Sequence, residues 1–214
     1  MKTMRPLLRV LPEARRPYVI LNVAYYGLVI CGMAFTALNP SLHESLMTAV
    51  AESLSEGPLA PVWEAYSTER VLLATALTVG INLSVGSFAT ITLPSLIVPF
   101  SGLVMAVARA LTWGVLFSPQ AVTGIGVREL LTGVSLAVLV FLEGQGYVLA
   151  ALGAYLHGRA FLWPRTVGAH SRRLGYWRGL KTQVRIYVLI ALTLLAAAMY
   201  EVIIAVFALP ALLH

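Results

Sequence analysis

The stretch Leu130–Leu156, LLTGVSLAVLVFLEGQGYVLAALGAYL, decides the fold that the sequence predicts. Its only charged residue is Glu143, near the middle. A membrane-spanning helix needs about 20 apolar residues, and at about 1.5 Å per residue this run exceeds the ~30 Å hydrocarbon core of a bilayer. We therefore expect a transmembrane helix that is tilted, kinked at its glycines or broken into two half-helices.

Four further apolar runs accompany it. The first, Tyr18–Leu38, contains no charged residue. It is longer than the ~7–15-residue apolar core of a signal peptide, and no clear cleavage site follows, which favours a retained helix. The predicted fold is an all-α, polytopic transmembrane helical bundle with about five spans. These spans cover residues 18–38, 71–93, 97–117, 130–156 and 186–209, to the nearest few residues.

The composition is typical of a membrane protein. Hydrophobic residues make up 59% of the chain and charged residues 11%, whereas soluble domains have about 25% charged residues. A surface this poor in charge is expected to meet lipid rather than water. The single cysteine, Cys31, excludes an intrachain disulfide and a multi-cysteine metal site. We predict neither a metal nor a cofactor.

Basic residues are concentrated in two segments, Met1–Pro17 and His157–Arg185. With five spans both segments fall on the same side of the membrane, and the positive-inside rule places that side in the cytoplasm. The expected location is the cell membrane, with the N-terminus cytoplasmic and the C-terminus outside. A sixth span would put the two segments on opposite sides. Topology and anionic lipid explain the net charge of +6, so we expect a lipid bilayer and no nucleic acid as partner.

The spans define the domain organisation. Residues 1–17 are predicted to form a basic cytoplasmic leader, and residues 18–214 the transmembrane bundle. Between the first two spans, Ser41–Ser55 places apolar residues at four-residue spacing. This pattern predicts a short amphipathic helix outside the membrane.

Four polar residues interrupt the apolar runs: Asn82, Arg109, Glu143 and Glu201. Counted along each run, all four lie within several ångströms of the bilayer midplane. A charge there costs about 2.5–3.5 kcal/mol on insertion scales, so pairing, protonation or water must relieve it. We expect Arg109 to pair with one glutamate, while the other is protonated or faces a wet cavity. The cluster indicates a proton or ion relay or a substrate site; a structural pair that fixes helix register is the alternative.

Small residues and basic residues form two further groups. Helix packing, within the chain or between subunits, is expected at Gly86, Gly144, Gly146, Gly153 and Ala197. The second basic segment interleaves arginine with aromatic residues and resembles an interfacial amphipathic segment. Its predicted headgroup-binding residues are Arg165, Arg172, Arg173, Arg178 and Lys181. His157 and His170 are expected to be solvated or to face headgroups, because neither has a partner at metal-ligand spacing.

Several short motifs carry a resemblance to a known family. They are the basic leader before the first span, Ile81-Asn82-Leu83, the stretch LEGQGYVLAALG at residues 142–153, and AAMYE at residues 197–201. Together they resemble the stage II sporulation protein M family of multi-spanning membrane proteins. That family usually has Pro-His-Gly before its first glutamate, whereas Leu139 stands at the histidine position here. The resemblance implies a membrane component without catalysis of its own, which scaffolds partners or is permease-like.

The sequence contains no G-x-S-x-G, P-loop or H-E-x-x-H motif, so we expect no enzyme. Our first hypothesis is a non-enzymatic integral membrane subunit that scaffolds or stabilises a membrane complex. Its partners would be other membrane protein subunits or further copies of this chain. The alternative is a transporter or channel component with a midplane polar path through Arg109, Glu143 and Glu201.

Overall fold

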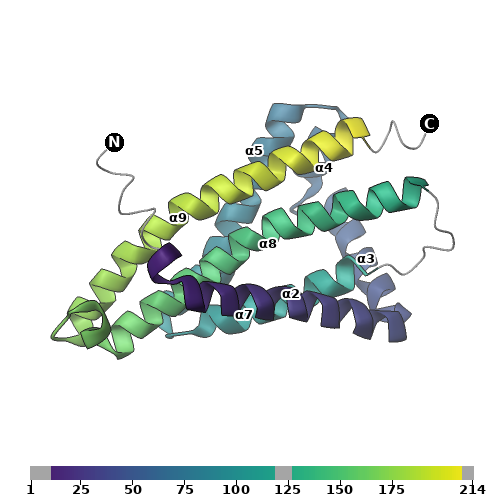
Figure 1. Ribbon diagram of the computed structural model, residues 1–214. Helices are drawn as coiled ribbons and strands as arrows, with labels where there is room; N and C mark the ends of the chain where they lie inside the picture. Colours follow the sequence, from purple (N-terminus) through teal and green to yellow (C-terminus); the bar gives the residue numbers. More distant parts are fainter. Residues whose placement is uncertain (1–10, 119–126, 209–214) are drawn as a thin grey trace.

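The computed structural model of the chain describes residues 11–118 and 127–208, and within these two ranges it contains helices and no strands. This confirms the all-α prediction. Figure 1 shows the arrangement of the helices. In chain order they are α2 (Arg15–Leu38), α3 (Pro40–Ser55), α4 (Ala60–Ser67), α5 (Val71–Ile81), the π-helical η1 (Asn82–Thr92), α6 (Leu93–Ile97), α7 (Ser101–Leu116), α8 (Val127–Leu162), the short 3₁₀ turn η2 (Pro164–Val167), α9 (Arg172–Ile203) and the π-helical η3 (Ile204–Ala208).

Four helical stretches are long and apolar enough to cross a membrane: Arg15–Leu38, Val71–Ile97, Leu131–Leu162 and Arg172–Phe207. They coincide with four of the predicted spans and indicate a multi-pass membrane protein. The fifth prediction, 97–117, corresponds to α7, an apolar helix of 16 residues. At 1.5 Å per residue α7 is about 24 Å long, which is shorter than the ~30 Å hydrocarbon core.

The long fourth run forms one continuous helix, α8, without a break at Gly144 or Gly146. This decides between the single helix and the two half-helices that the sequence left open. The helix also starts earlier and ends later than the apolar run. Likewise α9 begins at Arg172, whereas the sequence predicted a span from residue 186. Apolar composition marks only the part of a helix inside the hydrocarbon, and backbone hydrogen bonding carries the helix on into the polar interface.

The predicted amphipathic segment is helix α3, which begins at Pro40, a residue favoured at the first helical position. His43 of α3 lies 2.9 Å, through Nδ1, from the carbonyl oxygen of Val115 near the end of α7. At the other end of α7, the centroid of the Phe100 ring lies 6.1 Å from those of Tyr155, in α8, and of Trp163, which directly follows α8. Helix α7 therefore runs from the end of the bundle with the α8–α9 turn to the end with α3.

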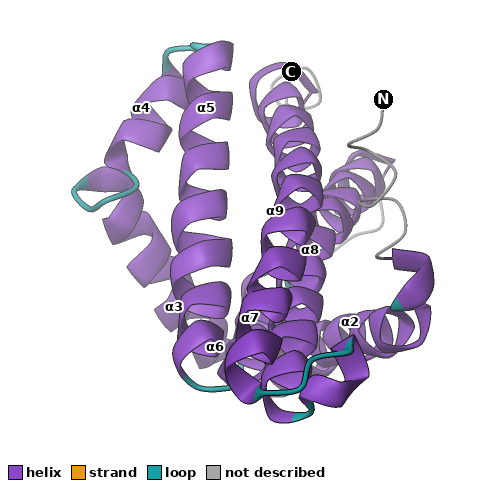
Figure 2. Ribbon diagram, turned by 90° about the vertical axis from the view of Figure 1, so that its left-hand side faces the viewer, coloured by secondary structure: helices purple, strands orange, loops and turns teal. Residues whose placement is uncertain are grey.

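Helices α8 and α9 form the most extensive helix pair and lie side by side in Figure 2. They run antiparallel, as the sequence colours in Figure 1 show. Glycines of α8 face side chains of α9. A Cβ atom at Gly146 would lie 2.5 Å from Leu194 Cδ2, and one at Gly153 would overlap the Gln183 amide. Ala197 of α9 is buried as well. Small residues thus bring the two long helices into close contact within the one chain.

The second membrane-length stretch changes its winding midway. Helix α5 leads into η1, whose wide π turns cover Asn82–Thr92, and α6 completes the stretch. π-Helical turns are rare and often occur at functional sites. A tight turn then leads into α7, with Phe100 in the left-handed region at φ 68°. The π segment is the irregular part of an otherwise regular bundle.

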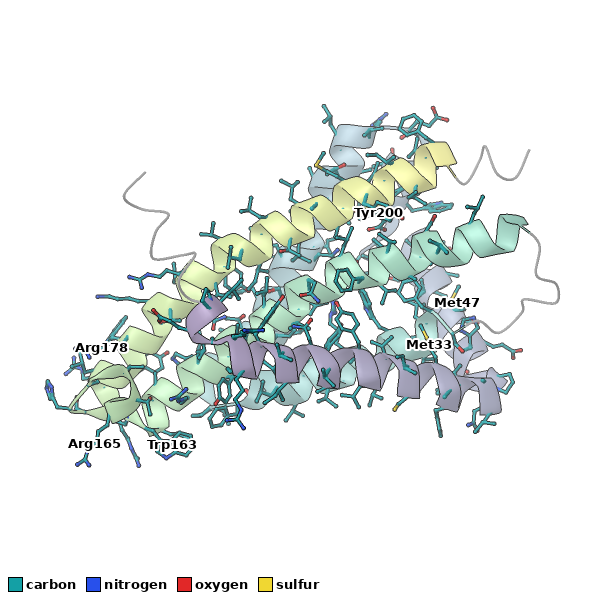
Figure 3. All side chains as sticks on the ribbon, viewed as in Figure 1. Met33, Met47, Trp163, Arg165, Arg178 and Tyr200 are labelled. Atoms are coloured by element: carbon teal, nitrogen blue, oxygen red, sulfur yellow. The ribbon has the colours of Figure 1, made fainter. Side chains whose placement is uncertain are left out.

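The end of the bundle with the α8–α9 turn carries exposed arginines. Figure 3 shows Trp163, Arg165 and Arg178 at the end with the α8–α9 turn, and Tyr200 toward the opposite end. The start of α2 lies toward the end with that turn (Figure 1). Between the ends, large apolar side chains are exposed, such as Val23, Leu72 and Leu192. Such surfaces suit lipid rather than water.

The crossing of α2 and α7 depends on two glycines and makes the packing testable. A Cβ atom at Gly114 would lie 2.7 Å from the Cα of Gly32, a backbone atom that cannot rotate away. We expect Gly114→Ala to destabilise the protein by about 1–3 kcal/mol through overpacking. The matched control is Gly80→Ala, where a Cβ meets open space. Thermal unfolding in detergent measures both; equal midpoints for the two variants would contradict this packing.

Candidate functional site

Tyr147 connects the buried arginine and the buried glutamate. Its hydroxyl donates a hydrogen bond of 2.5 Å to Glu143 Oε1 and accepts one of 3.3 Å from Arg109 Nη2. The Arg109 guanidinium also lies over the Tyr147 ring, 4.0 Å from its centroid. We call these three residues the Tyr147 unit. The expected direct ion pair between Arg109 and a glutamate is not found in the part of the chain that the structure describes, because the tyrosine stands between the two charges.

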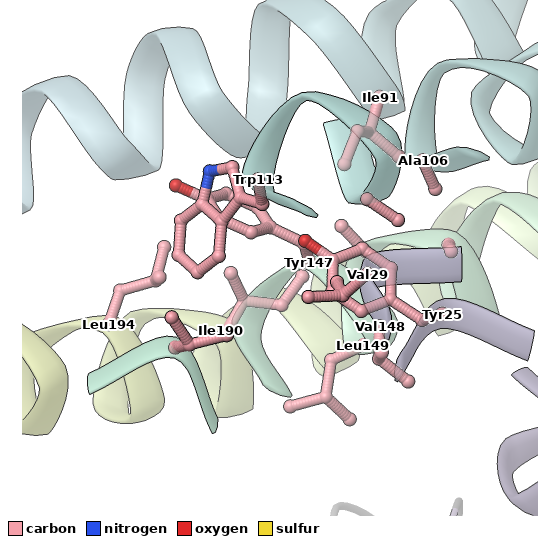
Figure 4. Packing of buried hydrophobic residues seen from close by; sticks show 14 of the residues in the cluster. Tyr25, Val29, Ile91, Ala106, Trp113, Tyr147, Val148, Leu149, Ile190 and Leu194 are labelled. Carbon is pink, nitrogen blue, oxygen red and sulfur yellow. The ribbon is translucent and has the colours of Figure 1, made fainter. Parts of the chain in front are cut away.

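Local geometry explains why the three side chains meet. Glu143 and Tyr147 are four residues apart on α8 and so share one face of that helix. Arg109 comes from α7, and Trp113, one turn further along α7, packs edge-on against the Tyr147 ring at 5.6 Å (Figure 4). Gly86 of η1 closes the remaining side. A Cβ atom there would lie 2.8 Å from Arg109 Nη2 and 2.9 Å from the Tyr147 hydroxyl.

The site is buried in the core of the bundle. Tyr147 is fully buried, and Glu143 is 8% exposed. Two polar atoms beside it, Arg109 Nε and the Tyr25 hydroxyl oxygen, are buried and make no hydrogen bond within the described chain. An unpaired buried polar group costs about 1–3 kcal/mol. The Tyr147 unit therefore has spare hydrogen-bonding capacity in an apolar setting.

Glu201 lies in a neighbouring group rather than in the Tyr147 unit. Its carboxylate interacts with Tyr66 of α4, and the Tyr66 hydroxyl lies 3.2 Å from Thr78 Oγ1 of α5. Burial raises the pKa of the Tyr66 phenol, and the Glu201 charge raises it further, so the hydroxyl keeps its proton. Glu143 and Glu201 lie within electrostatic range of one another. The two glutamates are neighbours with different tyrosine partners.

Asn82 does not join either group. It is the first residue of η1, it is half-buried, and its side chain makes no hydrogen bond within the described chain. Equal depth along the apolar runs correctly predicted that Arg109 and Glu143 lie close to one another. It was insufficient for Asn82, because depth does not specify the direction in which a side chain points.

Gln145 ties α8 to α2 through a network that the sequence did not single out. Tyr18 donates to Gln145 Oε1 at 2.6 Å, and Gln145 Nε2 donates to Asn22 Oδ1 at 2.6 Å and to the Tyr26 hydroxyl at 2.8 Å. Tyr18, Asn22 and Tyr26 follow one another at four-residue spacing on α2. This spacing could have predicted the network, since it places three polar groups on one face of the helix.

The remaining predicted residues fall into two places. The five small residues are buried at helix contacts inside the chain: Gly86, Gly144, Gly146, Gly153 and Ala197. The five predicted headgroup-binding residues are all exposed near the α8–α9 turn: Arg165, Arg172, Arg173, Arg178 and Lys181. Arg178 also donates a 2.6 Å hydrogen bond to the Val167 carbonyl oxygen and so holds the turn.

His157 is a correction to the sequence prediction. His170 is exposed as expected, but His157 is only 1% exposed and lies between α8 and α9. Its ring packs edge-on against Tyr176 at 4.7 Å. The prediction was wrong because α8 continues past the end of the apolar run, which brings His157 into the contact with α9.

Comparison with known proteins finds no match among family models, curated proteins or solved structures. The resemblance to the stage II sporulation protein M family therefore stays a prediction. In the described ranges, no three His, Cys, Asp or Glu side chains are grouped as metal ligands.

The Tyr147 unit can be tested by removing one oxygen atom. Tyr147→Phe keeps the ring but leaves Glu143 and Arg109 without their shared partner. We expect a loss of about 1–3 kcal/mol in stability, the usual cost of an unpaired buried polar group. The measurement is thermal unfolding in detergent, with Tyr155→Phe as control, since that hydroxyl makes no hydrogen bond in the described ranges. A Tyr147→Phe variant as stable as the control would contradict the role given to the hydroxyl.

Proposed function

We propose that this protein is a component of a membrane transport system, in which the Tyr147 unit forms the midplane element of a polar path. The single observation that supports this is the enclosed Arg109–Tyr147–Glu143 arrangement in the core of a multi-pass bundle. Ionisable side chains inside a membrane are costly, and they commonly mark ion pathways or proton relays.

The choice between transport and scaffolding rests on where the small residues lie. A scaffold would use small-residue faces to hold other subunits. Here Gly144, Gly146 and Gly153 pack against the chain's own helices α2 and α9, so they are not available to another subunit. The buried polar groups, by contrast, go beyond what helix packing requires, because polar atoms beside the Tyr147 unit make no hydrogen bond within the described chain. This supports the transport alternative over the first hypothesis.

The proposal includes a membrane topology. We take α7 as a fifth crossing, since it runs from the turn end to the α3 end and local bilayer thinning accommodates a short span. Five crossings place the start of α2 and the α8–α9 turn on one side. The positive-inside rule assigns that side to the cytoplasm and the C-terminus to the outside. The basic residues of the turn, among them Arg172 and Arg173, then lie at the anionic headgroups of the inner leaflet.

A second candidate function, a subunit of a membrane complex, is favoured by one observation. The first part of α8 is poorly covered, and its side chains Leu131, Val134, Leu136 and Val138 are 38–53% exposed. Among the described residues, the other helices leave these four side chains exposed and available to contact another membrane protein. The proposed partner is a second copy of the chain, and the resemblance to the stage II sporulation protein M family supports work within a complex.

Transport can be measured as charge movement across vesicles that contain the purified protein. On a solid-supported membrane, concentration jumps of K⁺, Na⁺, Cl⁻ and H⁺ report any conducted ion. We expect a current that falls about tenfold or more in Glu143→Gln, since a change of about 1.4 kcal/mol in a barrier alters a rate tenfold. The control is Glu64→Gln, which removes an exposed carboxylate on α4. Absence of current in the parent protein for all four ions would overturn the proposal for the isolated chain.

Self-association through α8 can be measured by cross-linking. A Val134→Cys variant in a Cys31→Ser background should form a disulfide-linked dimer in membranes. A control cysteine at Val23, which is 70% exposed on α2, should remain monomeric. Equal dimer yields from the two positions would indicate random collision and would remove the support for a second copy on α8.

A further inference from the structure

Buried polar side chains extend from the Tyr147 unit along the second membrane-length stretch. Thr78, Ser87, Thr92 and Ser95 of this stretch are all buried, with exposed fractions of 7% or less. At 1.5 Å per residue, Thr78 and Ser95 are at most about 25 Å apart along the helix axis. The hydrocarbon core is about 30 Å thick. One element thus carries buried hydroxyl groups through most of a bilayer's depth.

The outer part of this line is the group around Glu201. Tyr66 interacts with the Glu201 carboxylate and lies 3.2 Å from Thr78 Oγ1. The middle part is the Tyr147 unit, which touches η1 at Gly86. Ser87, the next residue of η1, begins the inner part. The three parts therefore follow one another along a single helical element.

The inner part is a chain of hydrogen-bonded groups between η1 and α9. Ser87 Oγ lies 3.1 Å from the Tyr187 hydroxyl. Thr92 Oγ1 accepts hydrogen bonds of 3.2 Å from both the Tyr187 hydroxyl and Gln183 Nε2. These side chains bond to one another instead of turning toward a common point. Their arrangement is a line and not a cage.

His157 stands at the inner end of the line. Its two ring nitrogens are buried and have no hydrogen-bond partner of regular geometry within the described chain, although the ring approaches the backbone of Ser95; Gln183 Oε1 is buried and unpaired as well. The two residues are neighbours, because His157 packs on Gly179, one helical turn from Gln183 on α9. Unpaired polar atoms also lie beside the middle part, at Arg109 Nε and the Tyr25 hydroxyl. Inside proteins, ordered water is the usual partner of such groups.

We propose that this line, from Glu201 through Tyr147 and Tyr187 to His157, carries protons across the membrane, with water completing it at the unpaired atoms. The inference rests on the proposed transport function and names its substrate. Hydroxyl, carboxyl and imidazole groups both donate and accept hydrogen bonds, as proton transfer requires. A metal ion would need several ligands around one point, and no such group of His, Cys or acidic residues occurs in the described ranges.

The proton balance along the line is simple. Each hydroxyl or water releases its own proton to the next group as it accepts one from the previous group, so every O–H bond broken is matched by one formed. Arg109 and the Gln183 amide keep their protons, and Arg109 stays a fixed charge. Water at the unpaired Gln183 Oε1 and His157 nitrogens carries the proton between Thr92 and His157. The Tyr147 unit is neutral while Glu143 is ionised, and it carries one positive charge while Glu143 holds the proton in transit. The net result is one proton moved and no other change.

Two variants interrupt the line without touching the Tyr147 unit. Tyr187→Phe removes one hydroxyl oxygen and keeps the ring, and His157→Gln keeps a polar side chain that cannot carry a proton as imidazolium. The matched controls are Tyr155→Phe and His170→Gln, whose side chains lie outside the line. The assay is proton uptake into proteoliposomes that contain K⁺, driven by valinomycin and followed with a pH-sensitive dye. Thermal unfolding midpoints show which variants are folded.

We expect proton uptake to fall about tenfold in Tyr187→Phe and in His157→Gln, and to stay unchanged in both controls. Uptake that persists in a folded Tyr187→Phe variant would overturn the proposal. A different ion whose movement depends on Glu143, with no proton movement, would overturn this inference and leave the proposed transport function standing. Absence of all ion movement would overturn both.

Discussion

The hydrogen bonds of the Tyr147 hydroxyl are the interaction on which the interior of this bundle depends. Arg109 and Glu143 come from different helices and would each be an isolated charge in an apolar core. The hydroxyl accepts from one and donates to the other, and the ring supplies a face for the guanidinium. An unpaired buried polar group costs about 1–3 kcal/mol, and a charged group costs more, so this arrangement lowers the cost of burying both residues.

The packing around the Tyr147 unit follows from the same requirement. Gly86 leaves space where a side chain would collide with both Arg109 and Tyr147, and it sits in the π-helical segment η1. Gly146 lets Leu194 of α9 approach α8 next to the tyrosine. Glycine is expensive in a regular helix, by about 0.5–1 kcal/mol relative to alanine. Its presence on both sides of Tyr147 indicates that close approach of the surrounding helices is worth that cost.

The sequence predicted the coarse features because they depend on composition and length. Long apolar runs yield the membrane-length helices, and the intramembrane charges point to a polar interior. The sequence could not reveal Tyr147 as the connecting residue, since a tyrosine in an apolar run looks like ordinary core. The sequence also led to a wrong prediction of an exposed His157, because the contact between α8 and α9 extends beyond the end of the apolar runs. Which residues on facing helices meet depends on helix rotation, and a single sequence leaves rotation undetermined.

The small residues show the same limit in another form. The sequence shows small residues at Gly144, Gly146 and Gly153. It does not decide whether they pack against helices of the same chain or against another subunit. The contacts with Tyr26, Leu194 and Gln183 assign them to the chain itself. That assignment shifts the functional emphasis from surfaces that hold partners to the polar interior between α8, α9 and η1.

The most direct test of this account is a double-mutant cycle on Arg109 and Glu143. Unfolding free energies are measured for Arg109→Gln, Glu143→Gln and the double variant. Each single change leaves one buried charge without its counterpart, whereas the double variant removes both charges. The account predicts that the double variant is more stable than the sum of the single effects implies, by about 1 kcal/mol or more. Effects that add within about 0.3–0.5 kcal/mol would show that the two residues are independent and would contradict it.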